Sequence, residues 1–324
     1  MPLQELLYLS RRDVETVDMP VIDIILALEA MFAEKGRGTT ELPPKVGIHP
    51  SEEGFIHAMP AWIPGQRSAG VKWISAFPDN LKDGLPSASG LLILNDPGTG
   101  VPIAVMDATW ITAKRTGAAT ALAAKYLARE DSTRVGIVAC GVQGKSNLEA
   151  LAALFSITTV KAFDAYPEVA EHYAKEMGET LDLDIETVKH PREAISGMDI
   201  VVTSGPIRKH PEPVIEAGWL SEGAFASPVD YDSYWQGEAM AQGDKFATDD
   251  RNQFETIRQA GYLQETPAPY ADLGEIAVGS RPGRESDTER NFSMNLGIAL
   301  DDMAIAIIIY RRAVELGIGT RLSL

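Results

Sequence analysis

Apolar residues in the first third of the chain recur in short runs that proline and glycine interrupt. A helical pattern over residues 21–33 comes first, with apolar positions three and four residues apart. The runs after it are PPKVGIH (43–49), GFIHAMPAWI (54–63), AGVKWISAF (69–77), SGLLILND (89–96) and VPIAVMD (101–107). Short runs bounded by turn residues are typical of strands joined in sequence. Up to about Asp107, the pattern therefore predicts a helix and a mainly antiparallel sheet.

From Thr116 to about Gly279 the pattern changes to helices that alternate with short apolar strands. The predicted helices are 117–128, 142–155 and 167–177, and the predicted strands are 135–139, 160–163, 200–203, 224–227 and 245–248. Such alternation predicts a parallel sheet covered by helices on both faces. A last helix, about Asn295 to Leu316, is expected to return to the first domain. The chain is thus an α/β protein with two domains, residues 1–115 plus 305–324 and residues 116–304.

Composition and charge narrow the function. The 324 residues carry a formal net charge of −17, which repels nucleic acid and anionic membrane surfaces. The strongly apolar run Met303 to Ile309 is far too short to span a bilayer, and the first twelve residues lack the order of a signal peptide. The single cysteine, Cys140, cannot form an internal disulfide, so we expect a cytoplasmic protein. The five histidines have no metal-binding spacing, so we expect no metal.

One segment has the order of a dinucleotide-binding turn. The strand 135–139 runs directly into Cys140-Gly141-Val142-Gln143-Gly144 and then a helix. Gly141 lets the backbone approach a pyrophosphate, and the amides at the helix start are unpaired donors. The spacing is A-x-G-x-x-G, with Ala139 at the usual first glycine, so an ordinary strand-to-helix turn is the alternative.

A carboxylate supports the nucleotide interpretation. Asp164 follows the next strand, 20 residues after Gly144, where it can accept hydrogen bonds from the adenosine ribose. Ala165, Tyr166 and Pro167 provide no cation for a 2′-phosphate, so NAD is favoured over NADP. The alternative for Asp164 is a solvated helix N-cap.

Three cations and one carboxyl group are candidates for the reacting end. Lys45 and Lys72 lie in predicted strands, and Arg115 directly precedes the small-residue helix TGAATALAA. On a chain this acidic, such cations can hold a substrate carboxylate, although Lys72 could instead be an edge-strand lysine that blocks aggregation. Asp230 follows the strand GAFASP at the carboxyl edge of the parallel sheet, where ligands gather, and it can accept a proton. Its alternative is a loop aspartate that caps the next turn.

Several blocks together resemble one known family. The blocks are PPKV (43–46), HAMPAW (57–62), VKWISAFPDN (71–80), GLPSASGLLILNDPGTGVPIAVMDA (84–108), TAKRTGAATALAAKYLARED (113–131), GVQG (141–144), FDAYPE (163–168), DIVVTSG (199–205) and GIALDDMAIA (297–306). In this order they resemble the ornithine cyclodeaminase, alanine dehydrogenase and μ-crystallin family, most of all its archaeal alanine dehydrogenase branch. The resemblance covers nearly the whole chain.

The resemblance implies a fold, a cofactor and roles for residues. It implies a homodimer in which the first domain, α+β, binds substrate and dimerises, while the middle of the chain is a doubly wound Rossmann domain that binds NAD. Lys45, Lys72 and Arg115 resemble the residues that hold the substrate carboxylate or act as acid and base, and Asp230 resembles the residue that activates water or the leaving amine. The positions that match cofactor contacts are Ser87, Thr116, Gly141, Val142, Gln143, Asp164, Thr203 and Ser204.

Two positions near the substrate depart from the family pattern. His57 stands where relatives often have arginine, and Asn295 lies at the nicotinamide end in a segment that replaces the usual D-S-T-G lead. The function implied is hydride transfer at the α-amino carbon of a small L-amino acid or an imine, as in an amino-acid dehydrogenase or a ketimine reductase.

Three other functions stay open at this point. One is an ornithine cyclodeaminase that recycles NAD within the turnover, and another is a nucleotide-dependent ligand-binding protein. The third, a 2-hydroxy acid dehydrogenase, would require a histidine–carboxylate pair as its base, and no such pair is apparent.

Overall fold

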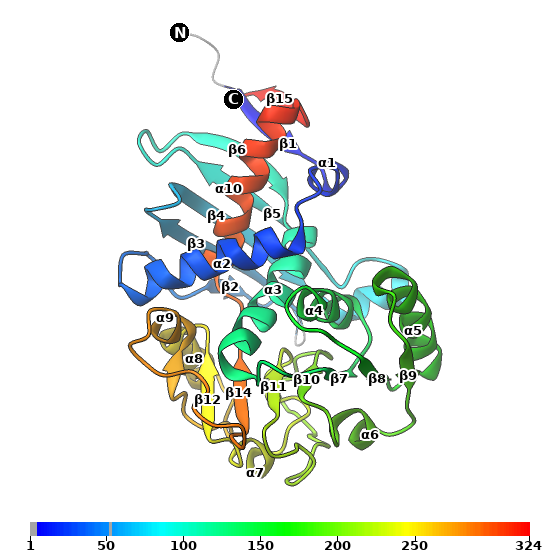
Figure 1. The fold of residues 1–324 in the computed structure, drawn as a ribbon. Helices are drawn as coiled ribbons and strands as arrows, with labels where there is room; N and C mark the ends of the chain where they lie inside the picture. Colours follow the sequence, from blue (N-terminus) through cyan, green and yellow to red (C-terminus); the bar gives the residue numbers. More distant parts are fainter. Residues whose placement is uncertain (1–4, 52–53) are drawn as a thin grey trace. The chain divides into compact units, whose positions relative to one another are not determined.

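The computed structural model describes residues 5–51 and 54–324 (Figure 1), so the first four residues of the segment examined for a signal peptide lie outside it. The chain forms two compact units. One contains the described part of Met1–Arg115 together with Ile298–Leu324, and the other is Thr116–Gly297. Each unit has its own sheet, as the alternation of patterns predicts.

The first unit is built on a mainly antiparallel sheet with the strand order β15-β1-β6-β5-β4-β3-β2. The strands are β1 (Glu5–Leu9), β2 (Val46–Ile48), β3 (Phe55–Ile63), β4 (Ser68–Ala76), β5 (Ala88–Asn95), β6 (Pro102–Asp107) and β15 (Thr320–Ser323). The five runs that the pattern marked as strands are β2 to β6, and each pairs antiparallel with the next. The sequence pattern missed β1 and β15, which extend the sheet beyond β6.

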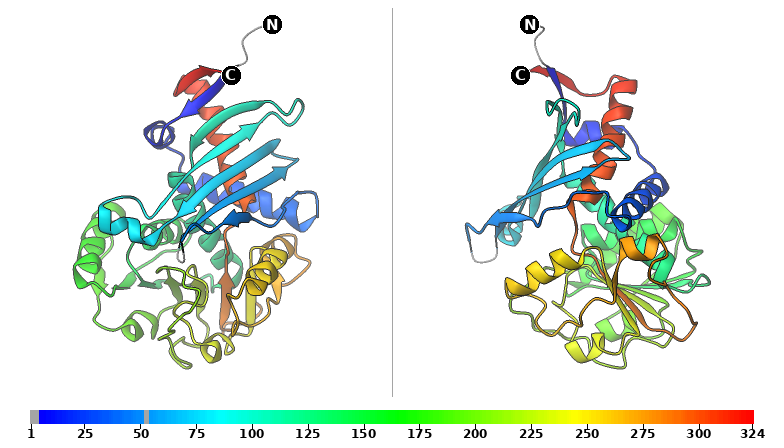
Figure 2. Two further views of the ribbon diagram at one scale, coloured as in Figure 1. Left: turned by 180° about the vertical axis from the view of Figure 1, so that it is seen from behind. Right: turned by 90° about the vertical axis from the view of Figure 1, so that its left-hand side faces the viewer.

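One face of this sheet is covered by two helices. They are α2 (Val21–Gly36) and α10 (Ala299–Leu316), and Figure 2 shows both on the same side of the strands. The last helix, which was expected to return to the first domain, is α10, and it packs on β3, β4 and α2. The helix begins at Ala299 rather than near Asn295, because Gly297 adopts a φ of +76° and Ile298 is extended. In the described part of the chain, no helix has the length and apolarity needed to cross a membrane.

The second unit is a doubly wound parallel sheet with the order β13-β12-β14-β11-β10-β7-β8-β9. Its strands are β7 (Arg134–Val138), β8 (Thr159–Phe163), β9 (Ile185–Thr187), β10 (Ile200–Thr203), β11 (Phe225–Pro228), β12 (Lys245–Thr248), β13 (Ala271–Asp272) and β14 (Asn291–Met294). All the strand pairs are parallel. Because β8 and β9 follow on one side of β7 while β10 and β11 lie on the other, the order reverses between β7 and β10. Ligands of doubly wound folds bind at such a switch point.

Helices cover both faces of the parallel sheet, which confirms the predicted Rossmann architecture. The helices are α4 (Val142–Ala152), α5 (Pro167–Leu181), α6 (Pro191–Ile195), α7 (Gly237–Met240), α8 (Arg251–Gln259) and α9 (Leu273–Ala277). A Cβ added to Gly136 would meet Ala194 of α6, whereas Gly144 of α4 faces the side chain of Ile137. Adjacent residues of a strand point to opposite faces, so α4 and α6 lie on opposite sides of β7.

The helix predicted at 117–128 begins earlier than the sequence pattern indicates. The observed helix α3 is Thr109–Leu127, and the boundary between the two units falls inside it. Its first amides, those of Thr109 and Trp110, donate to the carboxylate of Asp107. Three of the four residues in TWIT (109–112) are β-branched and have a weaker helix propensity, so the sequence pattern did not indicate that the helix begins here. Arg115 therefore lies within a helix, and the prediction that it precedes one is wrong. A short helix, α1 (Arg11–Thr16), was also missed.

Candidate functional site

The turn after β7 has the features of a dinucleotide cradle. Gly141 is the N-cap of α4 without any side-chain cap, and a Cβ added to it would meet nothing within 4 Å. Gly144 packs closely, because a Cβ there would lie 2.6 Å from the Ala139 carbonyl oxygen. The first amides of α4, on Val142 and Gln143, thus face an open approach at the helix amino terminus. This geometry fits a pyrophosphate.

Ala139 adopts a left-handed backbone conformation in this turn. Its φ is +72°, which explains why glycine is usual at this place in the fingerprint. The Ala139 amide donates to the carbonyl of Phe163 on the neighbouring strand, and the Ser204 hydroxyl donates to the Ala139 carbonyl at 2.9 Å. Ser204 therefore supports the turn at the switch point between β7 and β10.

Asp164 lies at the carboxyl end of β8, where the sequence interpretation required it. One carboxylate oxygen accepts the Cys140 amide at 2.8 Å, and the other accepts the Tyr166 amide at 2.9 Å. The helix that follows has Tyr166 as its N-cap, so Asp164 is not that N-cap. Each oxygen keeps a lone pair for a hydroxyl donor. The carboxylate is thereby oriented beside the glycine turn.

Asp230 lies just beyond the carboxyl end of β11 and is 1% exposed. Its Oδ1 accepts the Thr203 hydroxyl at 2.6 Å, and its Oδ2 accepts the Gly205 amide at 2.9 Å. Both donors are neutral, and no ion pair joins this carboxylate to another described residue. Burial raises its pKa from 3.8 to about 7, while the hydrogen bonds oppose that rise. The alternative of a turn cap is wrong, because the carboxylate bonds back to the loop after β10.

Thr203, predicted to contact the cofactor, is fully buried beside Asp230. Its single hydroxyl proton goes to Asp230, and its oxygen accepts the indole N–H of Trp235 at 3.1 Å. The sequence interpretation missed Trp235, which donates to Thr203 and thereby orients the hydroxyl that Thr203 donates to Asp230. In the described structure the Thr203 side chain therefore supports Asp230.

Asn295 closes the same edge of the sheet, directly after β14. It is 7% exposed, and its Oδ1 accepts the Ser293 hydroxyl at 2.9 Å. Within residues 5–51 and 54–324, nothing accepts a hydrogen bond from its buried Nδ2. A buried amide donor without an acceptor is costly unless a ligand supplies one. A carboxamide such as that of nicotinamide would suit this donor.

In the first unit, Lys72 lies on an internal strand, between β3 and β5, with its side chain 1% exposed. The edge-strand alternative is therefore wrong. Its Nζ lies 2.6 Å from Oδ2 of Asp302 and 3.5 Å from the hydroxyl oxygen of Thr112. Burial lowers the pKa of Lys72 from 10.5 to about 8, and the charge of Asp302 opposes that shift.

Arg115 belongs to the same buried charge cluster. Its Nε lies 3.4 Å from Oδ1 of Asp302, and its Nη1 lies 3.6 Å from Oδ2 of Asp301. The two aspartates lie in the first turn of α10 and are both fully buried. We define Lys72, Arg115, Asp301 and Asp302 as the buried ionic cluster. Sequence reasoning missed the two aspartates, although a pair of carboxylates at the start of a very apolar helix was the available signal.

The other predicted residues of this unit, His57, Lys45 and Ser87, are only half-buried, whereas Thr116 of the other unit is buried. His57 on β3 has a pKa lowered to about 4 by burial and then by the charge of Lys45, so it is neutral at physiological pH. It therefore provides no cation for a carboxylate there. Lys45 is half-buried just before β2, and Ser87 is half-buried just before β5. Thr116 is buried in α3, at the first residue of the other unit.

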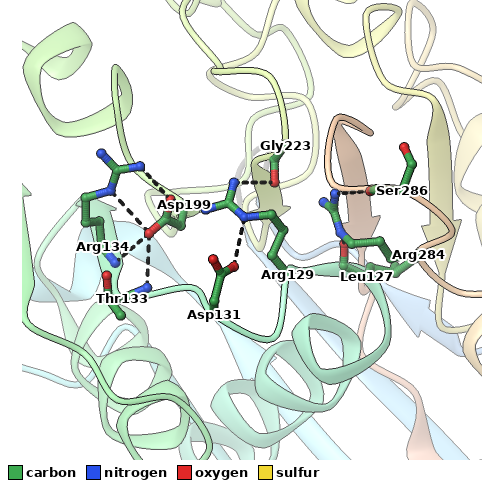
Figure 3. A network of polar contacts seen from close by, with 9 residues as sticks. All are labelled: Leu127, Arg129, Asp131, Thr133, Arg134, Asp199, Gly223, Arg284 and Ser286. Atoms are coloured by element: carbon green, nitrogen blue, oxygen red, sulfur yellow. Dashed lines mark hydrogen bonds and ion pairs between the residues drawn. The ribbon is translucent and has the colours of Figure 1, made fainter.

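A second charged network lies at the opposite, amino edge of the parallel sheet (Figure 3). Asp199, directly before β10, accepts hydrogen bonds from the guanidinium groups of Arg129 and Arg134 and from the backbone amides of Thr133 and Arg134. This pairing lowers the pKa of Asp199 to about 2 against the opposing effect of burial. The network joins the segment after α3, the start of β7 and the start of β10, so its role is to stabilise the fold.

Comparison with known proteins decides the family. The model of the ornithine cyclodeaminase/mu-crystallin family matches residues 5–317. The chain belongs to this family. It is 35% identical to an alanine dehydrogenase of Archaeoglobus fulgidus over 327 residues, which cover 98% of each chain.

Solved structures agree over the same length. A Δ1-pyrroline-2-carboxylate reductase of Thermococcus litoralis, in complex with NADH and L-proline, superposes with a TM-score of 0.89 at 34% identity, covering 97% of this chain and 99% of that one. An archaeal alanine dehydrogenase dimer with bound NAD gives a TM-score of 0.89 at 32% identity, covering 99% of this chain and all of that one. The resemblance noted from the sequence blocks is thus confirmed.

Proposed function

We propose that this chain is an NAD(H)-dependent enzyme that acts at the α-amino carbon of a small L-amino acid or of the corresponding imine. One observation carries the proposal. Gly141, Asp164 and Asp230 lie along the same carboxyl edge of one parallel sheet, so groups suited to a nucleotide and a protonatable carboxyl group share that edge. The alanine dehydrogenase and the pyrroline-2-carboxylate reductase among its relatives act on substrates of this kind.

The cofactor we assign is NAD. The amides of Val142 and Gln143 would hold the pyrophosphate, Asp164 the adenosine ribose and the Asn295 amide the carboxamide end. When bound, NAD(H) supplies the acceptor or donor of a hydride. Thr116, Ser87 and Ser204 are further proposed contacts, the last through its position beside the Ala139 turn.

The protein side chains divide the remaining work. Asp230, with a pKa of about 7, can take a proton near neutral pH or return one when the reaction runs in reverse. Protonated Lys72 and Arg115 provide positive charge for a substrate carboxylate, and Lys45, half-buried just before β2, is a further cation of the same unit. Burial removes competing water from Lys72 and Arg115 and strengthens their interactions.

A homodimer is the assembly that we propose. Val46, Ala58, Trp73 and Leu91 form one row across β2 to β5, on the face of the sheet opposite to Lys72. Val46 is 65%, Trp73 49% and Leu91 46% exposed. Such an apolar row on one chain is typical of a surface that a second copy covers, and the archaeal relative was solved as a dimer.

The test is a substrate panel with the purified protein. NAD is supplied with L-alanine, L-proline, L-ornithine and other L-amino acids, and both NADH and ammonia are measured. Equal amounts of both identify a dehydrogenase of primary amino acids, and NADH without ammonia from L-proline identifies a cyclic imine as the product. Ammonia without NADH would instead identify a cyclodeaminase. If no amino acid yields NADH or ammonia, and no imine consumes NADH, the proposal is contradicted and a binding role is favoured.

A further inference from the structure

A protonated amine in the interior of a sheet requires a specific partner. Transfer of an ammonium group from water into an apolar region is very costly, so buried lysines lose their proton unless an opposite charge lies close. Lys72 has only 1% of its side chain exposed, and the residues directly opposite it on β3 and β5 are Met59 and Leu92. The strands on either side therefore give it no charge at those positions.

The partner comes from the first turn of α10. Asp302 reaches Lys72 with one carboxylate oxygen, at 2.6 Å, and Arg115 with the other, at 3.4 Å. It thus bridges a cation of β4 and a cation of α3. Asp302 lies in the first turn of α10, where the positive end of the helix dipole attracts negative charge.

The other charged groups around Lys72 do not replace this partner. Arg115 repels the amine, and so would His57 and Lys45, from the β3 and β2 side, whenever they are charged. Asp301 also attracts it, but Asp301 forms an ion pair with Arg115, and its effect on the pKa of Lys72 is smaller than that of Asp302. The buried ionic cluster holds two positive and two negative groups, so loss of Asp302 leaves an excess of positive charge around Lys72.

We propose that Asp302 is a positioning residue that holds the Lys72 amine in place and keeps it protonated, while the positive charge of Arg115 lies beside the other oxygen of Asp302. The inference rests on the proposed function only in assigning Lys72 to the substrate carboxylate. Asp302 itself acts through Lys72 and need not touch substrate.

The experiment titrates Lys72 directly. The full-length protein is labelled with ¹³C at lysine Cε, and the signal absent from Lys72→Met identifies Lys72. In wild type we expect a midpoint at about pH 8. In Asp302→Asn, an isosteric change, we expect the midpoint to fall by at least ~1 pH unit. The matched control is Asp301→Asn, which removes the neighbouring charge and should move the midpoint less than half as far.

Three further results decide the matter. Asp302→Glu restores the charge and should return the midpoint towards wild type. If Asp302→Asn does not fold, the double variant Lys72→Met/Asp302→Asn should fold better, because it leaves no unpaired amine. An unchanged midpoint in Asp302→Asn, an equal shift in Asp301→Asn, or a double variant as unstable as the single one overturns the proposal. The titration needs no turnover, so this failure is distinct from failure of the substrate panel.

Discussion

Two aspartates of the parallel sheet are buried to nearly the same extent but have very different environments. Asp199, at the amino edge before β10, is 3% exposed, and Asp230, at the carboxyl edge after β11, is 1% exposed. Two arginines and backbone amides surround the first, and its pKa is lowered to about 2 (Figure 3). Only neutral donors hold the second, and its pKa is raised to about 7.

The difference shows that one sheet can carry a carboxylate that stabilises the fold at one edge and a carboxyl group that can exchange a proton at the other. A carboxylate that is paired with two arginines stays ionised at physiological pH and cannot exchange a proton, so its role is to stabilise the fold. A carboxyl group held by a hydroxyl and an amide keeps its position but can gain or lose a proton near pH 7. Asp230, whose protonation state can change, lies at the carboxyl edge of the sheet, and Asp199, which stays ionised at physiological pH, lies at the amino edge.

The largest expected effect comes from Asp230→Asn. The amide keeps the size of the side chain but cannot take up a proton, so we expect turnover to fall by at least ~100-fold. NAD affinity, measured by fluorescence titration, should change little. The unfolding free energy should also hold or rise at pH 8, because the folded state no longer carries a carboxyl group that resists ionisation between 3.8 and about 7. Wild-type turnover in this variant would remove Asp230 from the mechanism.

Asp199→Asn should show the reverse behaviour and is the matched control. Removing a carboxylate that holds two arginines is expected to lower the free energy of unfolding by about 3 kcal/mol. Because the pKa of Asp199 is depressed in the folded state, its contribution is complete above pH 3.8 and is lost as the pH falls towards 2. Urea unfolding at pH 7 and at low pH measures both. Turnover per folded molecule should stay near wild type, and a large loss would show that the two edges are not separable.

Asp164→Ala examines a third carboxylate, whose oxygens are held by two backbone amides. If it selects NAD by accepting ribose hydroxyls, its loss should narrow the preference for NAD over NADP by about 10-fold, equivalent to one lost charge-assisted hydrogen bond. The ratio of kcat/KM for the two cofactors measures this. An unchanged ratio would leave Asp164 with a structural role at the turn, closer to that of Asp199.

The smallest effect is expected from Ala139→Gly at the carboxyl edge. Ala139 adopts a φ of +72°, a conformation that glycine accepts without strain, so the variant should be more stable by about 0.5 to 1 kcal/mol. Thermal and urea unfolding measure the gain. No gain, or a loss, would show that the left-handed turn costs nothing in this protein.

Much of the fold could be predicted because strands and helices leave periodic patterns in the sequence. The alternation between residues 116 and 279 gave the parallel sheet and the edge that carries Gly141, Asp164 and Asp230. The pattern missed the edge strands β1 and β15, where tertiary pairing rather than hydrophobic alternation defines the strand. It also placed Arg115 before a helix, because TWIT is a poor helix former that Asp107 caps.

The site was less predictable because its partners are far apart in sequence. Lys72 stood out in the sequence as a lysine in an apolar strand, but its pairing with Asp302 depends on how α10 returns across the sheet. Thr203 donates to Asp230, and Trp235 donates to Thr203, and no local sequence motif marks these contacts. Neither pairing follows from spacing alone.

The pH dependence of NAD reduction tests the central claim most directly. On the proposed mechanism, Asp230 is ionised and Lys72 is protonated when an amino acid is oxidised, so we expect kcat/KM to rise through about pH 7 and to fall above about pH 8. Asp302→Asn should move the alkaline limb to lower pH, and Asp199→Asn should leave both limbs in place. A profile that is flat from pH 6 to 9, or an acid limb that Asp230→Asn retains, would contradict the account.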